Sequence, residues 1–362
     1  MGFASKLKAG GPAQPPQPLV ESNGLQMSAS HGARPQTALG QLSMPLQGGG
    51  SFQQYPGTGQ HSPLGQQGVQ QYSGTQPGRS QQHQGHVPGV LARLQSIVQV
   101  NGLEKFYTHQ ATQSLAQTID SSINFDFLAA SWGMPKELAI DLAALALYDT
   151  VILVDDSSSM SFEENGERIE DLKEILSKVA EVATLFDQDG IVIRFLNSRL
   201  EGNGIRNKED AENLVNQVRF QGLTPLAGSM QRNVLDSLVF RFAAAGELQK
   251  PVLVITITDG EPTDNPRDAI LHTIAGAKRR LAPQYGPKAV AFQFAQVGRD
   301  QRAQAFLERL DNHPEVGDII DCTSYFELEA EEFRKKGVDL TPHLWLVKMM
   351  VGAIDPSYDE MD

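Results

Sequence analysis

The sequence predicts an α/β protein with a doubly wound, mostly parallel sheet, preceded by a small helical module and a disordered N-terminal tail. Three observations support this prediction. Strand-length apolar runs alternate with helical patterns over residues 148–353. Residues 89–147 show helical periodicity alone. Gly, Pro and Gln occupy 43 of the first 88 positions and leave little to bury. We therefore divide the chain into 1–88, 89–147, 148–353 and an acidic tail, 354–362, which we expect to be solvated.

The net charge of −13 is the sum of two unlike segments. The first 88 residues carry +3 and the remainder carries −16. Nucleic-acid binding requires clustered Lys and Arg, so the acidic body excludes nucleic acid as a default partner. The same charge disfavours docking of the body on an anionic membrane.

The cysteine content and the hydropathy of the sequence indicate the cellular compartment. The single cysteine, Cys322, excludes an intramolecular disulfide framework and a multi-cysteine zinc site. No apolar run approaches the roughly 18 residues of a membrane-spanning helix, so we expect no stable membrane insertion. The first residues lack the apolar block of a secretory signal. We therefore expect a cytoplasmic protein.

The helical module contains four predicted helices, at 90–98, 115–119, 125–132 and 138–147. Gly133 can end the third of them. About 60 residues is close to the lower limit for independent folding, so we expect the module to pack on the domain that follows. A calcium-binding helix pair is disfavoured, because Asp120, Asn124 and Asp126 lack the ligand spacing of a calcium loop.

The α/β region contains five predicted strands, at 150–154, 191–196, 251–257, 289–297 and 316–320. The first is continuously apolar, which is typical of a parallel strand buried on both faces. Helices are predicted at 169–186, 230–242, 266–281 and 301–310. A final amphipathic segment, 344–351, should cover the sheet. This alternation favours a doubly wound sheet with right-handed crossovers.

Polar side chains gather at two predicted strand ends and on one loop. Residues 155–159 follow the first strand with the pattern Asp-x-Ser-x-Ser, and residues 258–260, Thr-Asp-Gly, follow the third. The loop at 222–225, Gly-Leu-Thr-Pro, precedes a helix. Ligands of doubly wound sheets bind outside the carboxyl ends of the strands, so we expect the three clusters to face one point.

The chemistry of these clusters indicates a divalent ion. Alternate residues of an extended turn point the same way, so Asp155, Ser157 and Ser159 can present three oxygens together. Thr224 and Asp259 complete a set of three hydroxyls and two carboxylates. Such hard oxygen donors suit Mg²⁺ or Mn²⁺ better than zinc or copper. We assign no catalytic residue.

The charge of this ligand set predicts how the ion would be used. Two carboxylates at most neutralise a divalent ion, and the neutral hydroxyls leave it electrophilic. A further oxygen ligand is then favoured, ideally a carboxylate from another molecule. Calcium sites instead enclose the ion with several acidic groups. We therefore expect a metal that captures a protein partner through a Glu or Asp.

The three motifs also carry a family resemblance. With Asp155, Ser157 and Ser159 in the first motif, Thr224 before a proline and Asp259 before a glycine, residues 148–351 resemble a von Willebrand factor type A domain with a metal-ion-dependent adhesion site. The resemblance covers a little over half of the chain. It implies a Rossmann-like fold and magnesium-dependent protein binding in which a partner's Glu or Asp completes the coordination. Intracellular members of the family commonly act as scaffolds.

Three alternatives remain open. The motif residues can form a hydrogen-bonded turn without a metal, because Ser and Asp are common turn formers. A Mg²⁺-dependent phosphohydrolase would use Asp155 as its nucleophile, but Ser157 stands where that pattern needs an aspartate, so the general acid is missing. Thirdly, the N-terminal tail can be the active part of a scaffold whose α/β domain is purely structural. We predict a binding protein and not an enzyme.

Overall fold

The computed structural model describes residues 3, 6–7, 86–187 and 189–358. The disorder predicted for the N-terminal tail therefore falls mostly outside the described residues.

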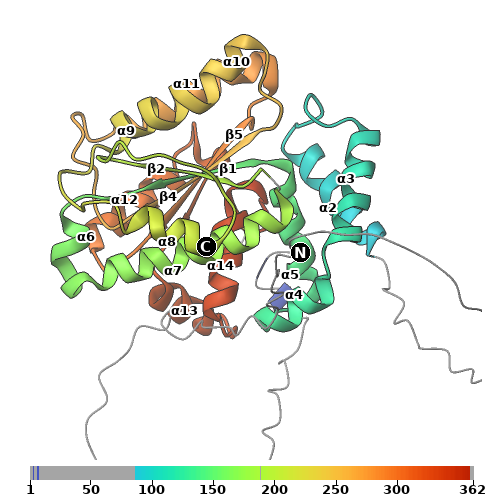
Figure 1. Ribbon diagram of the computed structural model, residues 1–362, viewed down its shortest axis with the longest axis horizontal. Helices are drawn as coiled ribbons and strands as arrows, with labels where there is room; N and C mark the ends of the chain where they lie inside the picture. The colour runs from blue at the N-terminus through green and yellow to red at the C-terminus, as the bar shows by residue number, and fades with distance from the viewer. Residues whose placement is uncertain (1–2, 4–5, 8–85, 188, 359–362) are drawn as a thin grey trace, which may run out of the picture. The chain divides into compact units, whose positions relative to one another are not determined.

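A six-stranded sheet in the order β3-β2-β1-β4-β5-β6 forms the centre of the fold (Figure 1). The strands are β1 (Asp149–Val154), β2 (Ile191–Phe195), β3 (Gly202–Ile205), β4 (Val252–Thr258), β5 (Val290–Gln296) and β6 (Ile320–Thr323). Every neighbouring pair is parallel except β2 and β3. The predicted fold class, a doubly wound and mostly parallel sheet, is confirmed.

Helices cover both faces of the sheet. They are α6 (Ser159–Phe162), α7 (Glu167–Phe186), α8 (Lys208–Val215), α9 (Leu226–Ser229), the π-helical η4 (Met230–Phe240), α10 (Arg241–Ala245), α11 (Ala269–Tyr285), α12 (Gln301–Asp311), α13 (Phe326–Lys335) and α14 (Pro342–Val351). Apolar residues of η4, α11 and α12 share one core with Val151 and Leu153 of β1. On the other face, α7 contacts β2, and α14 contacts β5 and β6. The two-sided burial explains why the central strands are mostly apolar and buried along nearly their whole length.

The predicted elements of the α/β region are mostly confirmed, with corrections at several places. The last strand begins at Ile320 and not at residue 316, because residues 317–319 form a 3-10 turn. The edge strand β3 and the helices α8 and α13 are absent from the prediction. β3 contains two glycines and no alternation of apolar residues, so it lacks the pattern by which strands are predicted. The segment predicted to cover the sheet is present as α14, which contacts β5 and β6. It is not amphipathic as predicted, because every residue from Leu344 to Val351 is buried.

The helical module consists of α2 (Val87–Val100), α3 (His109–Ser122), α4 (Phe125–Trp132), α5 (Lys136–Asp141) and the 3-10 segment η2 (Leu142–Leu147). All four predicted helices are present, and Gly133 ends α4 in the left-handed conformation, with φ of 58°. The segment η2 contacts α7, α14 and β1, and the ring of Phe106 stacks on Tyr285 at 5.6 Å. The module therefore packs on the α/β domain, as expected. None of the described helices is both long and apolar enough to cross a membrane.

The prediction of a solvated C-terminal tail is wrong at three of the described positions. Ile354, Asp355 and Tyr358 are buried. Asp355 forms an ion pair with Arg93 of α2, and the Tyr358 hydroxyl donates a hydrogen bond of 2.8 Å to Asp141. Asp355 is buried here because a cation compensates its charge.

The start of the chain also contacts this region, which corrects the predicted tail at two positions. Phe3 is fully buried, and its ring stacks on that of Tyr358 at 4.7 Å. The backbone N–H of Phe3 donates to the carbonyl of Ser357 at 3.0 Å. Lys6 forms an ion pair with Asp141 at 2.6 Å. An aromatic ring in a polar, glycine-rich segment gives no periodicity, so sequence patterning does not reveal this docking.

Candidate functional site

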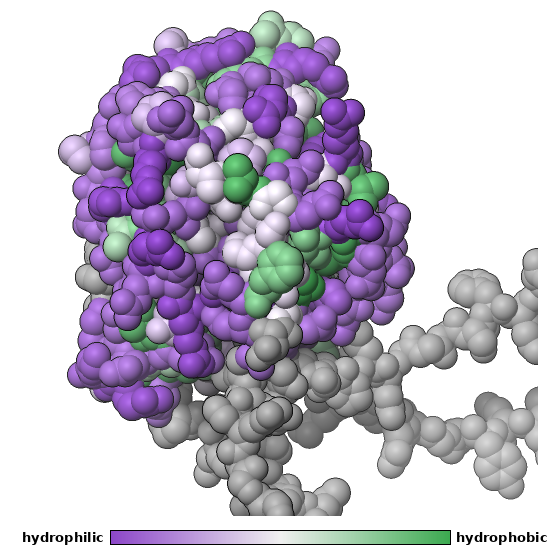
Figure 2. Space-filling model, turned by 90° about the vertical axis from the view of Figure 1, so that its left-hand side faces the viewer, coloured by the Kyte–Doolittle hydropathy of each residue, from purple (hydrophilic) through white to green (hydrophobic). Residues whose placement is uncertain are grey.

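The strand order creates a crevice at the carboxyl ends of β1 and β4. From β1 the chain passes to β2 on one side of the sheet, whereas β4 pairs with β1 on the other side. Ligands of open α/β sheets bind where the strand order reverses in this way. Asp155 follows the last residue of β1, and Asp259 follows the last residue of β4. Helix α6 follows β1 at the left of Figure 1, and this side faces the viewer in Figure 2.

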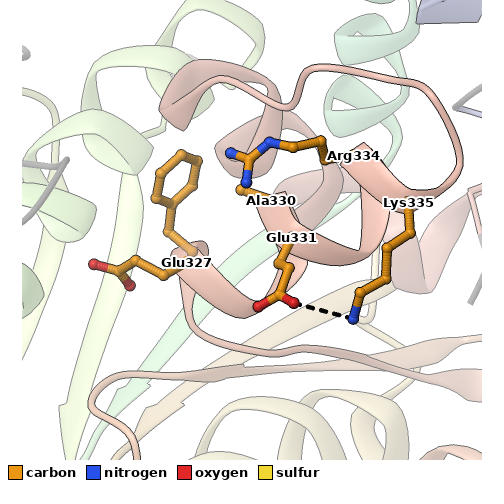
Figure 3. Close-up of a pocket in the computed structure, with 6 residues that line it drawn as sticks. Glu327, Ala330, Glu331, Arg334 and Lys335 are labelled. Carbon is orange, nitrogen blue, oxygen red and sulfur yellow. Dashed lines mark ion pairs between the residues drawn. The ribbon is translucent and has the colours of Figure 1, made fainter.

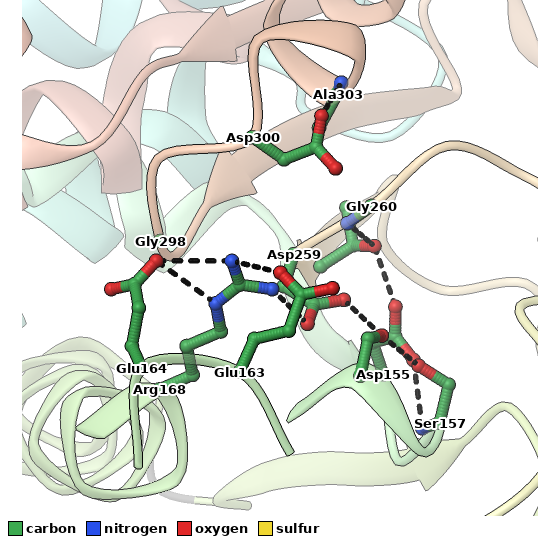
Figure 4. Close-up of polar contacts among 12 residues, drawn as sticks. Asp155, Ser157, Glu163, Glu164, Arg168, Asp259, Gly260, Gly298, Asp300 and Ala303 are labelled. Atoms are coloured by element: carbon green, nitrogen blue, oxygen red, sulfur yellow. Dashed lines mark hydrogen bonds and ion pairs between the residues drawn. The ribbon is translucent and has the colours of Figure 1, made fainter. Parts of the chain in front are cut away.

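Hydrogen bonds join the two strand ends directly (Figure 4). The carboxylate of Asp155 accepts from the backbone N–H of Ser157 at 2.9 Å. The hydroxyls of Ser157 and Ser159 lie 3.0 Å apart. The Ser159 hydroxyl donates to Oδ1 of Asp259 at 2.9 Å. The other oxygen of Asp155 accepts from the hydroxyl of Thr258, at the end of β4, at 2.7 Å. Four of the five predicted site residues therefore form one connected cluster.

Thr224 lies on a loop that is tied to this cluster through its neighbours. The backbone N–H of Ser158 donates to the carbonyl of Gly222 at 3.1 Å, and the N–H of Gly222 donates to the Ser158 hydroxyl at 3.0 Å. Gly222 has φ of 101°, a conformation that favours glycine. Thr224 is buried and its N–H donates to the hydroxyl of Thr263, but within the described residues its own hydroxyl forms no hydrogen bond.

The two carboxylates of the cluster are withdrawn from water. Asp155 and Asp259 are both fully buried, whereas Ser159 is partly exposed. Burial, followed by the neighbouring Asp259 carboxylate, raises the pKa of Asp155 to about 6. Burial also raises the pKa of Asp259, although its hydrogen bonds with Arg168 and Ser159 oppose this shift. Two buried carboxylates so close together favour a cation beside them.

Arg168 of α7 is a component of the site that the sequence patterns do not reveal. Its side chain is buried, and its Nη1 contacts Oδ2 of Asp259 at 2.6 Å. Its Nη2 contacts carboxylate oxygens of Glu163 at 2.7 Å and Glu164 at 3.0 Å (Figure 4). A charged residue in the first turn of an amphipathic helix is normally predicted to be exposed. Its contact with Asp259, 91 positions away, carries no sequence signal.

The cluster contains oxygen donors of the kind that could hold a small, hard divalent cation. Asp155, Asp259, Glu163 and Glu164 outnumber the single guanidinium of Arg168, so the ionised site is negatively charged. Among the residues that the structure describes, no group of three or more His, Cys, Asp and Glu side chains is suited to hold a metal ion. Any ion here would therefore depend on the serine and threonine hydroxyls as well as on carboxylates. That donor set excludes zinc and copper as preferred ions and suits Mg²⁺ or Mn²⁺.

A separate hollow lies along α13 and has a different character (Figure 3). It measures about 630 Å³ and is lined by residues of this one helix. Glu331 and Lys335 on its wall form an ion pair of 3.2 Å. A single helix surface whose charges compensate one another offers no convergent set of groups that would bind a ligand.

Comparison of the chain with models of protein families gives no match, and comparison with curated proteins gives none either.

Proposed function

We propose that this chain is a divalent-cation-dependent protein-binding module of the von Willebrand factor type A class. In this proposal the ligands of Mg²⁺ or Mn²⁺ come from the cluster at the ends of β1 and β4 and from the adjoining loop. They are Asp155, Ser157, Ser159, Thr224 and Asp259. A Glu or Asp side chain of a protein partner would complete the coordination. We also propose a cytoplasmic location, which a single cysteine suits.

The observation that carries the proposal is the hydrogen-bonded path from Ser157 through Ser159 to Asp259. It joins the two strand ends that flank the switch point, where doubly wound sheets bind their ligands. All the side chains on this path offer oxygen and no nitrogen or sulfur. A plain structural turn would need only the local hydrogen bonds around Asp155, and it would not require a second buried carboxylate from β4.

Each group of residues would have its own role in binding the cation. The two carboxylates supply charge, the hydroxyls supply neutral ligands, and Arg168 holds one oxygen of Asp259 so that the other remains directed toward Ser159. A bound Mg²⁺ would supply positive charge and open coordination positions for an anionic oxygen. Because Arg168 offsets part of the local negative charge, the bound ion would keep an affinity for a further carboxylate.

Isothermal titration calorimetry with Mg²⁺ and Mn²⁺ tests the metal part of the proposal. We expect one site in the wild-type chain and at least tenfold weaker binding in Ser157→Ala and Asp259→Ala. Asp236→Ala removes an exposed aspartate in η4 and serves as the matched control, which should bind like wild type. A wild-type chain that binds neither ion would refute the proposal.

The partner part is tested with a labelled peptide that carries one glutamate between glycines and serines. Binding should require Mg²⁺, disappear in EDTA and disappear when the glutamate is replaced by glutamine. A phosphatase assay under the same conditions provides the opposing test. Mg²⁺-dependent turnover that Asp155→Asn abolishes would instead favour the phosphohydrolase.

A further inference from the structure

A second hollow, of about 790 Å³, adjoins the candidate metal site. It lies between the loop after β2 and the loop that leads to Thr224. Asp156, Asn197 and Gly222 contribute to its wall, together with Arg199 and Arg219. Asp156 is the next residue after Asp155, and Gly222 is hydrogen-bonded to Ser158. The hollow and the metal site therefore share the β1–α6 turn as a common wall.

Hydrogen bonds to Asp156 hold the two loops in place. One oxygen of its buried carboxylate accepts from the backbone N–H of Asn197 at 2.8 Å, and the other accepts from Ser198 at 2.7 Å. Its backbone carbonyl accepts from Gln221 at 2.8 Å. Asp156 supplies the only carboxylate among the described residues of the wall, and backbone donors engage it. The shape of the hollow therefore does not depend on a ligand.

The hollow carries uncompensated positive charge. Arg199 and Arg219 are both exposed, and neither forms an ion pair or hydrogen bond within the described part of the chain. The nearby Glu201 contacts Arg194 at 3.4 Å. Two unpaired guanidinium groups on a chain of net charge −13 form a local reversal of sign. Such a patch attracts anionic groups, above all over distances within the Debye length of about 8 Å.

An apolar side chain lies on the loop between the arginines and the metal ligands. Leu223 is 67% exposed and directly precedes Thr224. The carbonyl of Leu223 accepts from the side-chain amide of Asn197 at 2.9 Å, which fixes its backbone. On this side of the molecule, pale and green residues gather within a mostly hydrophilic surface (Figure 2). The surface therefore combines the candidate metal site, an exposed apolar side chain and a basic hollow.

We propose that the hollow is a second subsite for the same partner, and this inference rests on the proposed function. The partner segment would be an acidic peptide with two carboxylates. One carboxylate would bind the metal ion, and the other would bind Arg199 and Arg219. A residue between them would lie against Leu223. Guanidinium groups suit this role because they bind carboxylates through two parallel hydrogen bonds.

Fluorescence anisotropy with a panel of labelled peptides tests the second subsite. One peptide carries a single glutamate among glycines and serines, and the others add a second glutamate after two, three, four or five residues, on either side. In Mg²⁺ we expect at least one of the two-glutamate peptides to bind about fivefold tighter than the single-glutamate peptide, as two exposed ion pairs permit. The gain should shrink as salt is raised.

Variants with matched net charge distinguish an effect of the arginines in the hollow from an effect of the overall charge of the chain. The double variant Arg199→Gln, Arg219→Gln should lose the additional affinity for the two-glutamate peptide and keep the wild-type affinity for Mg²⁺. Arg206→Gln with Arg241→Gln changes the net charge equally and should keep the gain. Arg206 follows β3 at the opposite end of β2 from the site, and Arg241 begins α10. All four arginines are exposed, so the variants should remain folded.

The outcomes distinguish the two proposals. If the single-glutamate peptide binds in Mg²⁺ and a second glutamate adds nothing at any spacing, the second subsite is wrong and the metal-dependent function stands. The same conclusion follows if the gain persists without Arg199 and Arg219. If no peptide binds although Mg²⁺ does, carboxylate capture itself is refuted, and the second subsite is refuted with it.

Discussion

At the scale of single residues, the balance of charge around Asp259 governs the site. Arg168 is buried against this carboxylate and is also held by Glu163 and Glu164. A buried ion pair contributes little net stability, but removal of one partner leaves the other charge unpaired. Arg168 should therefore affect both the stability of the fold and the attraction of the site for cations.

Replacement of Arg168 by methionine should have two opposite effects. Without Mg²⁺ the variant should be destabilised by about 3 kcal/mol, because Asp259 loses its buried cation. Addition of Mg²⁺ should raise the melting temperature of the variant by more than it raises that of wild type, since the uncompensated Asp259 carboxylate attracts the ion more strongly. Differential scanning fluorimetry with and without Mg²⁺ measures both. Lys173→Met, in the same helix but paired with Glu170, should show neither effect. Equal Mg²⁺ shifts in wild type and the Arg168 variant would contradict this explanation.

Asp171 of α7 predicts a dependence of stability on pH. Burial raises its pKa to about 7, and the carboxylates of Glu327 and Glu164 add to the shift. The folded chain therefore holds this proton more tightly than the unfolded chain, whose aspartates titrate near 3.9. The resulting stability is fully present below about pH 4 and is lost as the pH rises through 7.

Asp171→Asn should remove this loss. In urea unfolding, wild type should lose more stability between pH 5 and pH 8 than the variant does, and at pH 8 the variant should be the more stable protein. Glu170→Gln changes an exposed neighbour and should retain the wild-type slope. Parallel pH profiles for wild type and Asp171→Asn would show that this carboxyl titrates normally.

At the scale of elements, the loop after β5 supports the site from one side. Gly298 has φ of 74°, and a Cβ atom there would collide with the guanidinium of Arg168. Gly298→Ala should therefore destabilise the fold by about 2 kcal/mol, through both backbone strain and displacement of Arg168. Gly276 within α11 has open space around its Cα, so Gly276→Ala should instead stabilise by about 0.5–1 kcal/mol. Chemical denaturation measures the free energy of unfolding of the two variants. Equal changes in this free energy would contradict the explanation.

The predictability of the elements follows from how each is buried. Central strands such as β4 are buried along their whole length and mostly apolar because helices cover both faces, and this leaves a clear pattern. β3 is paired to β2 alone and contains Gly202 and Gly204, so no such pattern exists. The candidate ligands could be predicted because strand ends carry ligands in this architecture. Arg168, Arg199 and Arg219 could not, because their surroundings come from segments distant in sequence or from loops without periodicity.

At the scale of the whole molecule, both ends of the described chain meet at the helical module. Phe3 lies between the rings of Phe333 and Tyr358, at centroid distances of 5.7 and 4.7 Å. Phe3→Ala should destabilise the protein by about 3 kcal/mol, the usual cost of a truncated core aromatic. Thermal unfolding compared with Leu185→Ala, a half-exposed apolar position, measures the difference. An unchanged melting temperature would mean that the N-terminal residues are not docked in solution.

The bond between Ser159 and Asp259 spans 100 positions of the chain. Its two ends come together only when β1 and β4 are paired, so the proposed metal ligands cannot assemble on a fragment that stops before β4. Cation binding and completion of the sheet are then thermodynamically linked. An ion at one hundred times its dissociation constant would add about 2.7 kcal/mol to the free energy of unfolding. The ion would therefore bind only to the completely folded domain, and only the folded domain would expose the proposed binding surface.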